Sequence, residues 1–384
     1  MRRFLALLTL ALPASLAAQG SHDLTVRLHG TFLLNTFYND AKVSNEDLPI
    51  TASLPDATGL PATSLGATVR QTRLIATADQ DQVLGGHFHG ELDVDFYGGG
   101  QAGGFGRLSP LPRIRRAFGE LDWARSTLLV GEEAPPISDV NPRSLAAIGF
   151  PGFSGSGNLW LWIPQIRYDI DLKGGSGFRP GIGVALLAPT ASGGASPDSL
   201  VNFQPTIAER TGRPSIEARL TGRWGGSDGG TISLGGHYGW LATPGDTLLA
   251  SKGLGLSAII PITSTLELRG EAYTGQGMAA LGGGAIGQAS GTNGAPLKST
   301  GGWGQLTLLP NSIWEIGAGY GIDDPDDSQL GAGGRTKNAV ASGNVTWHVS
   351  PLVAGLEVRH LATTYLGTGT MQAWHVNLAL GFTF

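Results

Sequence analysis

The 384-residue chain has no cysteine and few charged residues, which make up only 14% of it. Without thiols it forms neither a disulfide-stapled secreted module nor a thiolate zinc site. A net charge of −5 disfavours a nucleic-acid-binding surface. The 61 glycines disfavour a coiled coil, because glycine at this density breaks helices. Disorder is disfavoured as well, since the chain carries 9 Trp, 7 Tyr and 13 Phe residues.

Long hydrophobic runs are absent too, so no segment predicts a helix that spans a membrane. In residues 1–18, two arginines at positions 2 and 3 precede the short apolar run 4–12, and small residues follow it. This three-part order is typical of a secretory signal peptide, with a buried N-terminal helix as the alternative. We therefore expect residues 1–18 to be removed on export and residues 19–384 to form one domain.

Alternation of apolar and polar residues with a period of two dominates the rest of the chain. In 373–384, for example, Trp374 and Leu378 share one face, whereas His375 and Asn377 share the other. This run is long for a soluble sandwich but fits a tilted strand that crosses a membrane. The runs of this kind are 24–38, 66–79, 84–97, 112–123, 126–132, 163–172, 179–189, 214–224, 231–242, 252–260, 264–274, 301–309, 312–320, 335–348, 352–363 and 370–384.

The connections between these sixteen runs alternate in length. Those after odd-numbered runs are mostly long, with 133–162 the longest, whereas those after even-numbered runs have only two to six residues. Short periplasmic turns and long external loops are typical of an outer-membrane barrel, whose sheet must close because lipid offers the backbone no partners. We predict an all-β transmembrane antiparallel barrel of about 16 strands. The 133–162 loop is expected to fold into the lumen, with an external lid as the alternative.

Charged residues gather on the polar faces of the predicted strands. Because sixteen strands leave an aqueous channel, we expect these faces to line a water-filled lumen and the apolar faces to meet lipid. A charged constriction selects solutes by its field as well as its width. For each arginine, an ion pair with a neighbouring lumen carboxylate is the alternative to a direct role in selectivity. The candidate pore-lining and constriction residues are Arg70, Arg73, Arg115, Arg116, Glu120, Glu132, Glu133, Asp139, Arg143, Arg167, Arg219, Arg269 and Arg359.

Aromatic residues lie toward the predicted strand ends, as in the interfacial girdles of membrane barrels. Trp224, Trp314 and Tyr238 are examples. The last strand ends in Phe384, with Phe382 two residues earlier. This ending resembles the membrane-assembly signal of bacterial porins, and that resemblance implies the barrel-assembly machinery as a partner.

Three short motifs follow one another in 113–168. The pattern Arg-x-Ala-aromatic-Gly-Glu-Leu spans 115–121, Leu-Val-Gly spans 129–131, and Pro-Gln-Ile-Arg-Tyr spans 164–168 after the long loop. This order resembles the DcaP-like trimeric outer-membrane porins, while the rest of the chain is similar only in strand plan. The resemblance implies a sixteen-stranded trimer that passes small, often anionic, solutes. Glu132 departs from it, because a polar neutral residue is more usual there.

Together these features predict a porin of the Gram-negative outer membrane. It is expected to let small hydrophilic solutes, anionic ones included, diffuse passively, and to form a homotrimer in outer-membrane lipid. We predict no enzyme activity, cofactor or metal. The acidic run 323–327 could hold Ca²⁺ through oxygen ligands, but a solvated external loop is the alternative. The alternative functions are an outer-membrane barrel enzyme or adhesin, and a secreted soluble β-rich glycan-binding protein.

Overall fold

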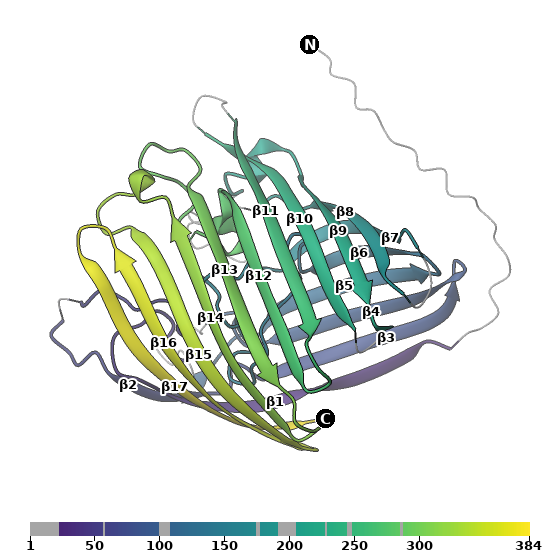
Figure 1. The fold of residues 1–384 in the computed structure, drawn as a ribbon, viewed down its shortest axis with the longest axis horizontal. Helices are drawn as coiled ribbons and strands as arrows, with labels where there is room; N and C mark the ends of the chain where they lie inside the picture. Colours follow the sequence, from purple (N-terminus) through teal and green to yellow (C-terminus); the bar gives the residue numbers. More distant parts are fainter. Residues whose placement is uncertain are drawn as a thin grey trace, which may run out of the picture.

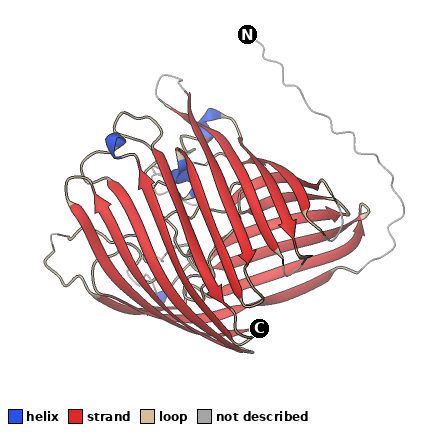
Figure 2. Cartoon of the chain, in the orientation of Figure 1, coloured by secondary structure: helices blue, strands red, loops and turns tan. Residues whose placement is uncertain are grey.

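The computed structural model describes residues 23–384 except 57, 100–107, 174–176, 191–204, 227–228, 244–247 and 285–286. The predicted signal peptide, residues 1–18, lies outside the described residues. The described chain is almost entirely antiparallel sheet, wound into a barrel (Figures 1 and 2). Within these described ranges, no helix is long and apolar enough to cross a membrane.

The strands succeed one another round the barrel in chain order. They are β1 (Thr25–Asn39), β2 (Ser64–Thr68), β3 (Arg73–Val83), β4 (Gly86–Asp95), β5 (Arg113–Trp123), β6 (Ser126–Glu133), β7 (Ile163–Asp171), β8 (Arg179–Leu187), β9 (Ser215–Trp224), β10 (Gly230–Ala242), β11 (Leu248–Pro261), β12 (Leu266–Gln276), β13 (Lys298–Leu308), β14 (Trp314–Pro325), β15 (Arg335–Val349), β16 (Leu352–Tyr365) and β17 (Gly369–Thr383). The short helices are η2 (Glu209–Thr211), η4 (Met278–Leu281) and η5 (Asp327–Gln329).

The barrel closes where its first and last strands meet. Residues 31–39 of β1 pair with 375–383 of β17, and the other edge of β1 pairs with β2 and β3 in succession. Because β2 and β3 share one position, the strands form a closed barrel of sixteen. At the seam, Gly30 N donates to Phe384 O at 3.1 Å, and Phe384 N donates to Gly30 O at 3.2 Å. The predicted fold class is confirmed.

The predicted run 66–79 is interrupted, however, and forms both β2 and β3. Between them Gln71 leaves the ladder and turns inward, where its side chain is fully buried. Its amide donates to Ala146 O at 2.8 Å and accepts from Ile148 N at 2.7 Å. The run 66–79 alternates poorly in sequence, but this local pattern does not locate the break, because the partners of Gln71 lie more than 70 residues away.

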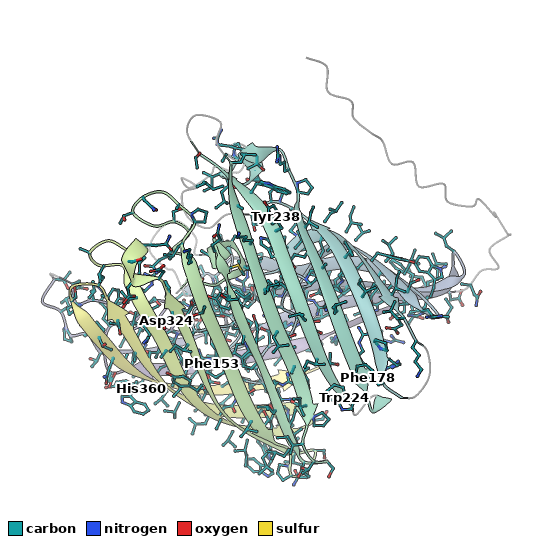
Figure 3. All side chains as sticks on the ribbon, turned by 45° about the horizontal axis from the view of Figure 1, so that its top comes forward. Phe153, Phe178, Trp224, Tyr238, Asp324 and His360 are labelled. Carbon is teal, nitrogen blue, oxygen red and sulfur yellow. The ribbon has the colours of Figure 1, made fainter. Side chains whose placement is uncertain are left out.

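The barrel is apolar outside and polar inside (Figure 3). In β17, Trp374 and Phe382 are 51% and 55% exposed, whereas His375 and Asn377 between them are fully buried. This reverses the usual arrangement of a soluble protein and suits a chain whose exterior solvent is lipid. As predicted, the apolar strand faces lie outside and the polar faces lie inside.

Outward-facing aromatic residues mark both ends of the barrel. Trp224 and Phe178 lie near the end that carries the short turns, and Tyr238 lies toward the opposite end (Figure 3). The ring of Phe178 covers Gly222, where an added Cβ would come within 2.6 Å of it. The glycine therefore allows an aromatic ring to lie flat on the wall at the level where girdles form.

Candidate pore lining and constriction

The arginines of β3 and β5 face the lumen in pairs with carboxylates. Arg73 donates to Asp93 with Nη2–Oδ2 at 2.6 Å. Arg116 binds Glu91 with Nη1–Oε1 at 2.9 Å and also contacts Glu133 at the end of β6. The side chains of Arg73 and Arg116 remain 28% and 27% exposed. Cross-strand pairing brings them together, because opposite residues of neighbouring strands share a face.

A second set of charges lies on β7 and β9. Arg167 Nε is 2.9 Å from Asp169 Oδ2, and Arg219 Nη2 is 3.1 Å from Asp169 Oδ1. Arg219 also contacts Asp139, which belongs to the connection between β6 and β7. Arg219 is almost completely buried, and such a charge is tolerated because carboxylates lie on two sides of it.

A third set joins this connection to the far wall. Arg143 Nε donates to Glu267 Oε1 on β12 at 2.9 Å, and Arg269 Nη2 lies 2.6 Å from the same oxygen. The hydrogen bond that Arg143 donates to Glu267 raises the pKa of Arg143 above its ordinary value. On β16, Arg359 and Glu357 form a buried pair.

Two further predicted arginines lie at the end of the barrel with the long connections. Arg70, between β2 and β3, binds Asp47 of the first long connection. Arg115 is buried on β5, 3.5 Å from both Asp93 and Asp95. Asp93 and Asp95 lie on the polar strand face that the sequence predicts to line the lumen. Asp47 was not predicted, because it lies in a long connection where no alternation marks an inward side.

Glu132 is the one predicted pore-lining residue that the structure moves to the other face. Its neighbours in register are Ala117 and the exposed Pro164, and Val130 on the same side of β6 is 52% exposed. Glu133, not Glu132, points inward. The adjacent carboxylates could not both face the lumen, since side chains alternate along a strand. The remaining candidate, Glu120, lies opposite the lumen-facing His89.

Residues 134–162 contact the inward-facing carboxylates of two distant strands. Glu217 on β9 accepts from Ile137 N at 2.8 Å. Glu271 on β12 accepts from Ser138 Oγ at 2.6 Å and from Leu159 N at 3.3 Å. These wall glutamates therefore hold the segment near both of its ends.

The middle of this segment contacts the wall further round. Ser144 Oγ donates to Glu357 on β16 at 2.5 Å, and Gly155 O accepts from Asn338 Nδ2 on β15 at 2.7 Å. The ring of Phe153 stacks on Trp303 of β13, with centroids 5.7 Å apart. The contacts of residues 134–162 thus extend from β9 to β16.

The first long connection, between β1 and β2, also packs against inward-facing residues. Ala52 N donates to Thr363 Oγ1 at 2.9 Å, and Ala52 O accepts from Tyr365 Oη at 2.8 Å. Leu48 and Asp47 of this connection are buried. The sequence predicts no role for this connection, because its composition resembles that of any external loop.

Exposed charge is distributed unevenly round the interior. On β16, both partners of the Arg359–Glu357 pair are at most 5% exposed. On β9, by contrast, Arg223 is 37% exposed beside Asp171, with Nη1–Oδ1 at 3.0 Å. Arg223 on β9 therefore keeps contact with solvent, whereas the pair on β16 is covered by Ser144 of the connection between β6 and β7.

The acidic run 323–327 does not converge on one point. Asp323 is buried and accepts from Tyr273 Oη at 2.7 Å, whereas Asp324 points outward. Asp326 accepts from its own turn at Ser328, with N–Oδ1 at 3.1 Å. Among the described residues, no group of three or more His, Cys, Asp or Glu side chains has the geometry to hold a metal ion.

No protein-family model matches this chain, and no curated protein matches it in sequence. Solved structures do match. The outer membrane channel DcaP of Acinetobacter baumannii has a TM-score of 0.73 at 17% identity, covering 94% of this chain and 97% of that one. The anion-selective porin from Comamonas acidovorans has a TM-score of 0.59 at 14% identity, covering 94% and 100%.

A third neighbour is OmpF of Salmonella typhi, solved with daunomycin. Its TM-score is 0.57 at 11% identity, and the match covers 94% of this chain and 97% of that one. The resemblance carried by residues 113–168 is confirmed at the level of the fold. The closed sixteen-stranded barrel and these structural matches show that the chain has the fold of the outer-membrane porins.

Proposed function

We propose that this protein is a porin of the bacterial outer membrane, through which small hydrophilic solutes diffuse passively. The observation that carries the proposal is the inverted barrel. Its exterior suits lipid, whereas partly exposed ion pairs such as Arg116–Glu91 and Arg223–Asp171 line its interior. Ionised side chains of this kind persist where water reaches them.

Anionic solutes belong to the proposed range. The side chains of Arg73, Arg116 and Arg223 remain partly exposed to solvent. Their guanidinium groups can therefore donate charge-assisted hydrogen bonds to a passing carboxylate or phosphate. Their carboxylate partners face the same space, so the lining presents both signs of charge side by side. A neutral or zwitterionic solute also finds partners there.

Residues 134–162 form the constriction in this proposal. They contribute Asp139 and Arg143, which pair with Arg219 on β9 and Glu267 on β12. A segment held from opposite parts of the wall narrows the channel and sets charges across it. Pore width and transverse field then act together on the solute.

Assembly and location complete the proposal. Residues 1–18 direct export and are removed, and the barrel inserts into outer-membrane lipid as a homotrimer. Phe382 and Phe384 present the terminal strand to the barrel-assembly machinery. Support comes from the seam, where the Phe384 ring stacks on Phe32 with centroids 5.0 Å apart and both rings face outward.

Planar-bilayer recording of the purified, detergent-folded protein tests the channel function. We expect stepwise ion conductance and a finite reversal potential in a salt gradient. The same protein, unfolded by heat before addition, is the control. A folded barrel without conductance above the detergent background would contradict the proposal and favour a barrel enzyme or adhesin.

A further inference from the structure

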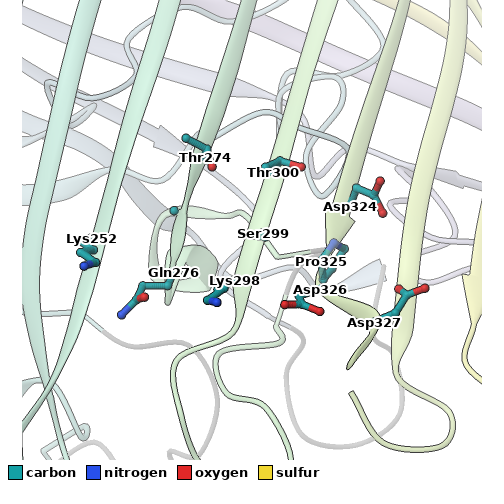
Figure 4. Close-up of a pocket in the computed structure, with 11 residues that line it drawn as sticks. Lys252, Thr274, Gln276, Lys298, Ser299, Thr300, Asp324, Pro325, Asp326 and Asp327 are labelled. Carbon is teal, nitrogen blue, oxygen red and sulfur yellow. The ribbon is translucent and has the colours of Figure 1, made fainter. Parts of the chain in front are cut away.

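Two outward pockets adjoin each other at the end of the barrel that carries the long connections. The first, of about 490 Å³, lies on β11 to β14 and is lined by two lysines and three aspartates (Figure 4). The second, of about 570 Å³, lies on β9 to β12 and is mostly apolar. Lys252, Thr274 and Gly275 line both, so the two pockets form one depression with a charged part and an apolar part.

The strand register orders the lysines of the charged part. Lys252 pairs with Gln276, and Gln276 pairs with Lys298, so two lysines flank an amide in one outward row. Within the described part of the chain, neither ammonium group lies within 4.0 Å of a carboxylate oxygen. Both lysines are therefore available to a phosphate.

Carboxylates line the opposite side of the charged part. Asp324 pairs with Thr300 in the next row, and Asp327 follows on the turn after β14. Figure 4 shows Lys252 and Asp327 on opposite sides of the pocket. A small anion would meet repulsion from these carboxylates. A phosphorylated sugar complements both sides, because its hydroxyl groups donate to carboxylates while its phosphate accepts from ammonium groups.

The apolar part begins beside Lys252, which pairs with Tyr238 on β10. Tyr238 and Leu254 form its rim and are 44% and 57% exposed. Gly236 pairs with Leu254 on one side and with Ala218 on the other, which makes the floor shallow-walled. A Cβ added at Gly236 would meet nothing closer than 3.6 Å, so the floor has room for an apolar chain.

We propose that the two pockets together bind a phosphorylated glycolipid of the external leaflet. Lys252 and Lys298 bind a phosphate, Asp324 and Asp327 accept from sugar hydroxyl groups, and an acyl chain occupies the apolar part at Gly236.

The position of the two pockets supports this occupant. The inference rests on the proposed function, which places the long connections outside the cell and this face in lipid. The external leaflet of a Gram-negative outer membrane consists of glycolipids whose sugar headgroups carry phosphates. A lipid of that chemistry therefore meets the charged part at the level of its headgroup.

Native mass spectrometry of the detergent-purified protein tests the inference. The probes are lipid A with two phosphates, the same lipid A after removal of its phosphates, and phosphatidylglycerol. We expect the protein to retain phosphorylated lipid A about tenfold better than the dephosphorylated form, because only the former accepts charge-assisted hydrogen bonds from the lysines. Equal retention of the two forms by the unchanged protein overturns the proposal.

The double variant Lys252→Gln, Lys298→Gln should lose the preference for phosphorylated lipid A. A matched control is Lys337→Gln, which changes an outward-facing lysine on β15 that lines neither pocket. This control should keep the preference. A loss of equal size in the control and the double variant overturns the assignment of the phosphate to Lys252 and Lys298.

The carboxylates are tested by the ratio of lipid A to phosphatidylglycerol. In the double variant Asp324→Ala, Asp327→Ala, the sugar loses its acceptors and a simple anionic headgroup no longer meets repulsion. Both effects lower the ratio. An unchanged ratio overturns the proposal that this side of the pocket recognises a sugar.

The apolar part is tested by Gly236→Leu, which fills its floor. Retention of phosphorylated lipid A should fall several-fold, because an acyl chain no longer fits. The matched control is Gly343→Leu, at an outward glycine of β15 outside both pockets, where an added Cβ would meet nothing closer than 3.9 Å. A heat-modifiable band in gels shows that each variant folds. Equal retention by the two variants overturns the acyl site.

Two other occupants are tested in the same samples. Soluble glucose 6-phosphate that displaces the lipid at equal concentration would identify a site for a free solute. A changed oligomeric mass in the lysine variant would assign the face to a second copy of the chain. Either result overturns the lipid site. Conductance of the same variants should stay unchanged, so a failed lipid site and a failed channel are distinguishable.

Discussion

At the scale of single residues, the interior depends on paired charges instead of apolar packing. Arg219 is nearly buried between Asp139 and Asp169, and Arg359 is buried against Glu357. Removing one partner of a buried pair costs about 3–5 kcal/mol, because the remaining charge is left without compensation. Substitutions in ion pairs that are exposed in the lumen destabilise the fold less, so they can be used to measure the effect of a charge on ion selectivity.

Arg116→Gln is such a change. It leaves Glu91 and Glu133 without their shared cation, so the lumen becomes more negative at this level. We expect the ratio of cation to anion permeability to rise about twofold, measured as the reversal potential in a KCl gradient. Arg125→Gln is the control, because Arg125 donates to Asp171 O at a turn outside the wall. An equal reversal potential in the two variants would remove Arg116 from the selectivity lining.

At the scale of elements, residues 134–162 contact inward-facing side chains of several strands. Their ends are held by Glu217 and Glu271, and their middle is held by Asn338 and Glu357. The contacts come from strands that lie far apart round the wall. We therefore expect the segment to stiffen the barrel as well as to narrow its interior.

Replacing residues 136–160 with a four-residue Gly-Ser linker tests this element. The linker suffices because β6 and β7 are hydrogen-bonded neighbours. We expect single-channel conductance to rise about twofold or more, since the constriction is removed. Trimming the external turn 330–333 is the control and should leave conductance unchanged. Unchanged conductance in the linker variant, with a heat-modifiable folded band in gels, would place the narrowest point elsewhere.

At the scale of the whole molecule, the apolar exterior demands a membrane and offers surface for association. Outward side chains such as Leu234, Leu256 and Leu378 are 43–48% exposed in the single chain. An apolar belt of this extent is rare on a soluble monomer. The chain is therefore expected to need detergent and to associate.

The predicted homotrimer can be tested by measuring the mass of the assembly in detergent. The detergent-solubilised protein should sediment at three times the mass of one chain, which is 39.7 kDa before removal of the predicted signal peptide, after correction for bound detergent. Unheated samples should migrate differently from boiled ones in gels, because a closed barrel resists unfolding. A monomeric mass with full conductance would contradict the trimer and leave the channel intact.

The sequence by itself determined the strands, their faces and the alternation of short and long connections. Those features are local, because the alternation of apolar and polar residues and the composition of a turn can each be recognised within about a dozen residues. It also placed Arg116, Arg167 and Arg219 on the inward face correctly, since each follows the alternation of its own strand. Phe382 and Phe384 lie on the outward face of the seam.

Only the tertiary structure shows which side chains and connections contact one another across the barrel. In the folded chain, the predicted strand 66–79 is interrupted at Gln71, Glu132 faces outward and Arg219 pairs with Asp139. The tertiary structure also brought the connection after β1 against Tyr365, more than 300 residues away. These outcomes depend on closure of the sheet. Closure sets the register and brings distant loops into one interior, and no local window of the chain contains that information.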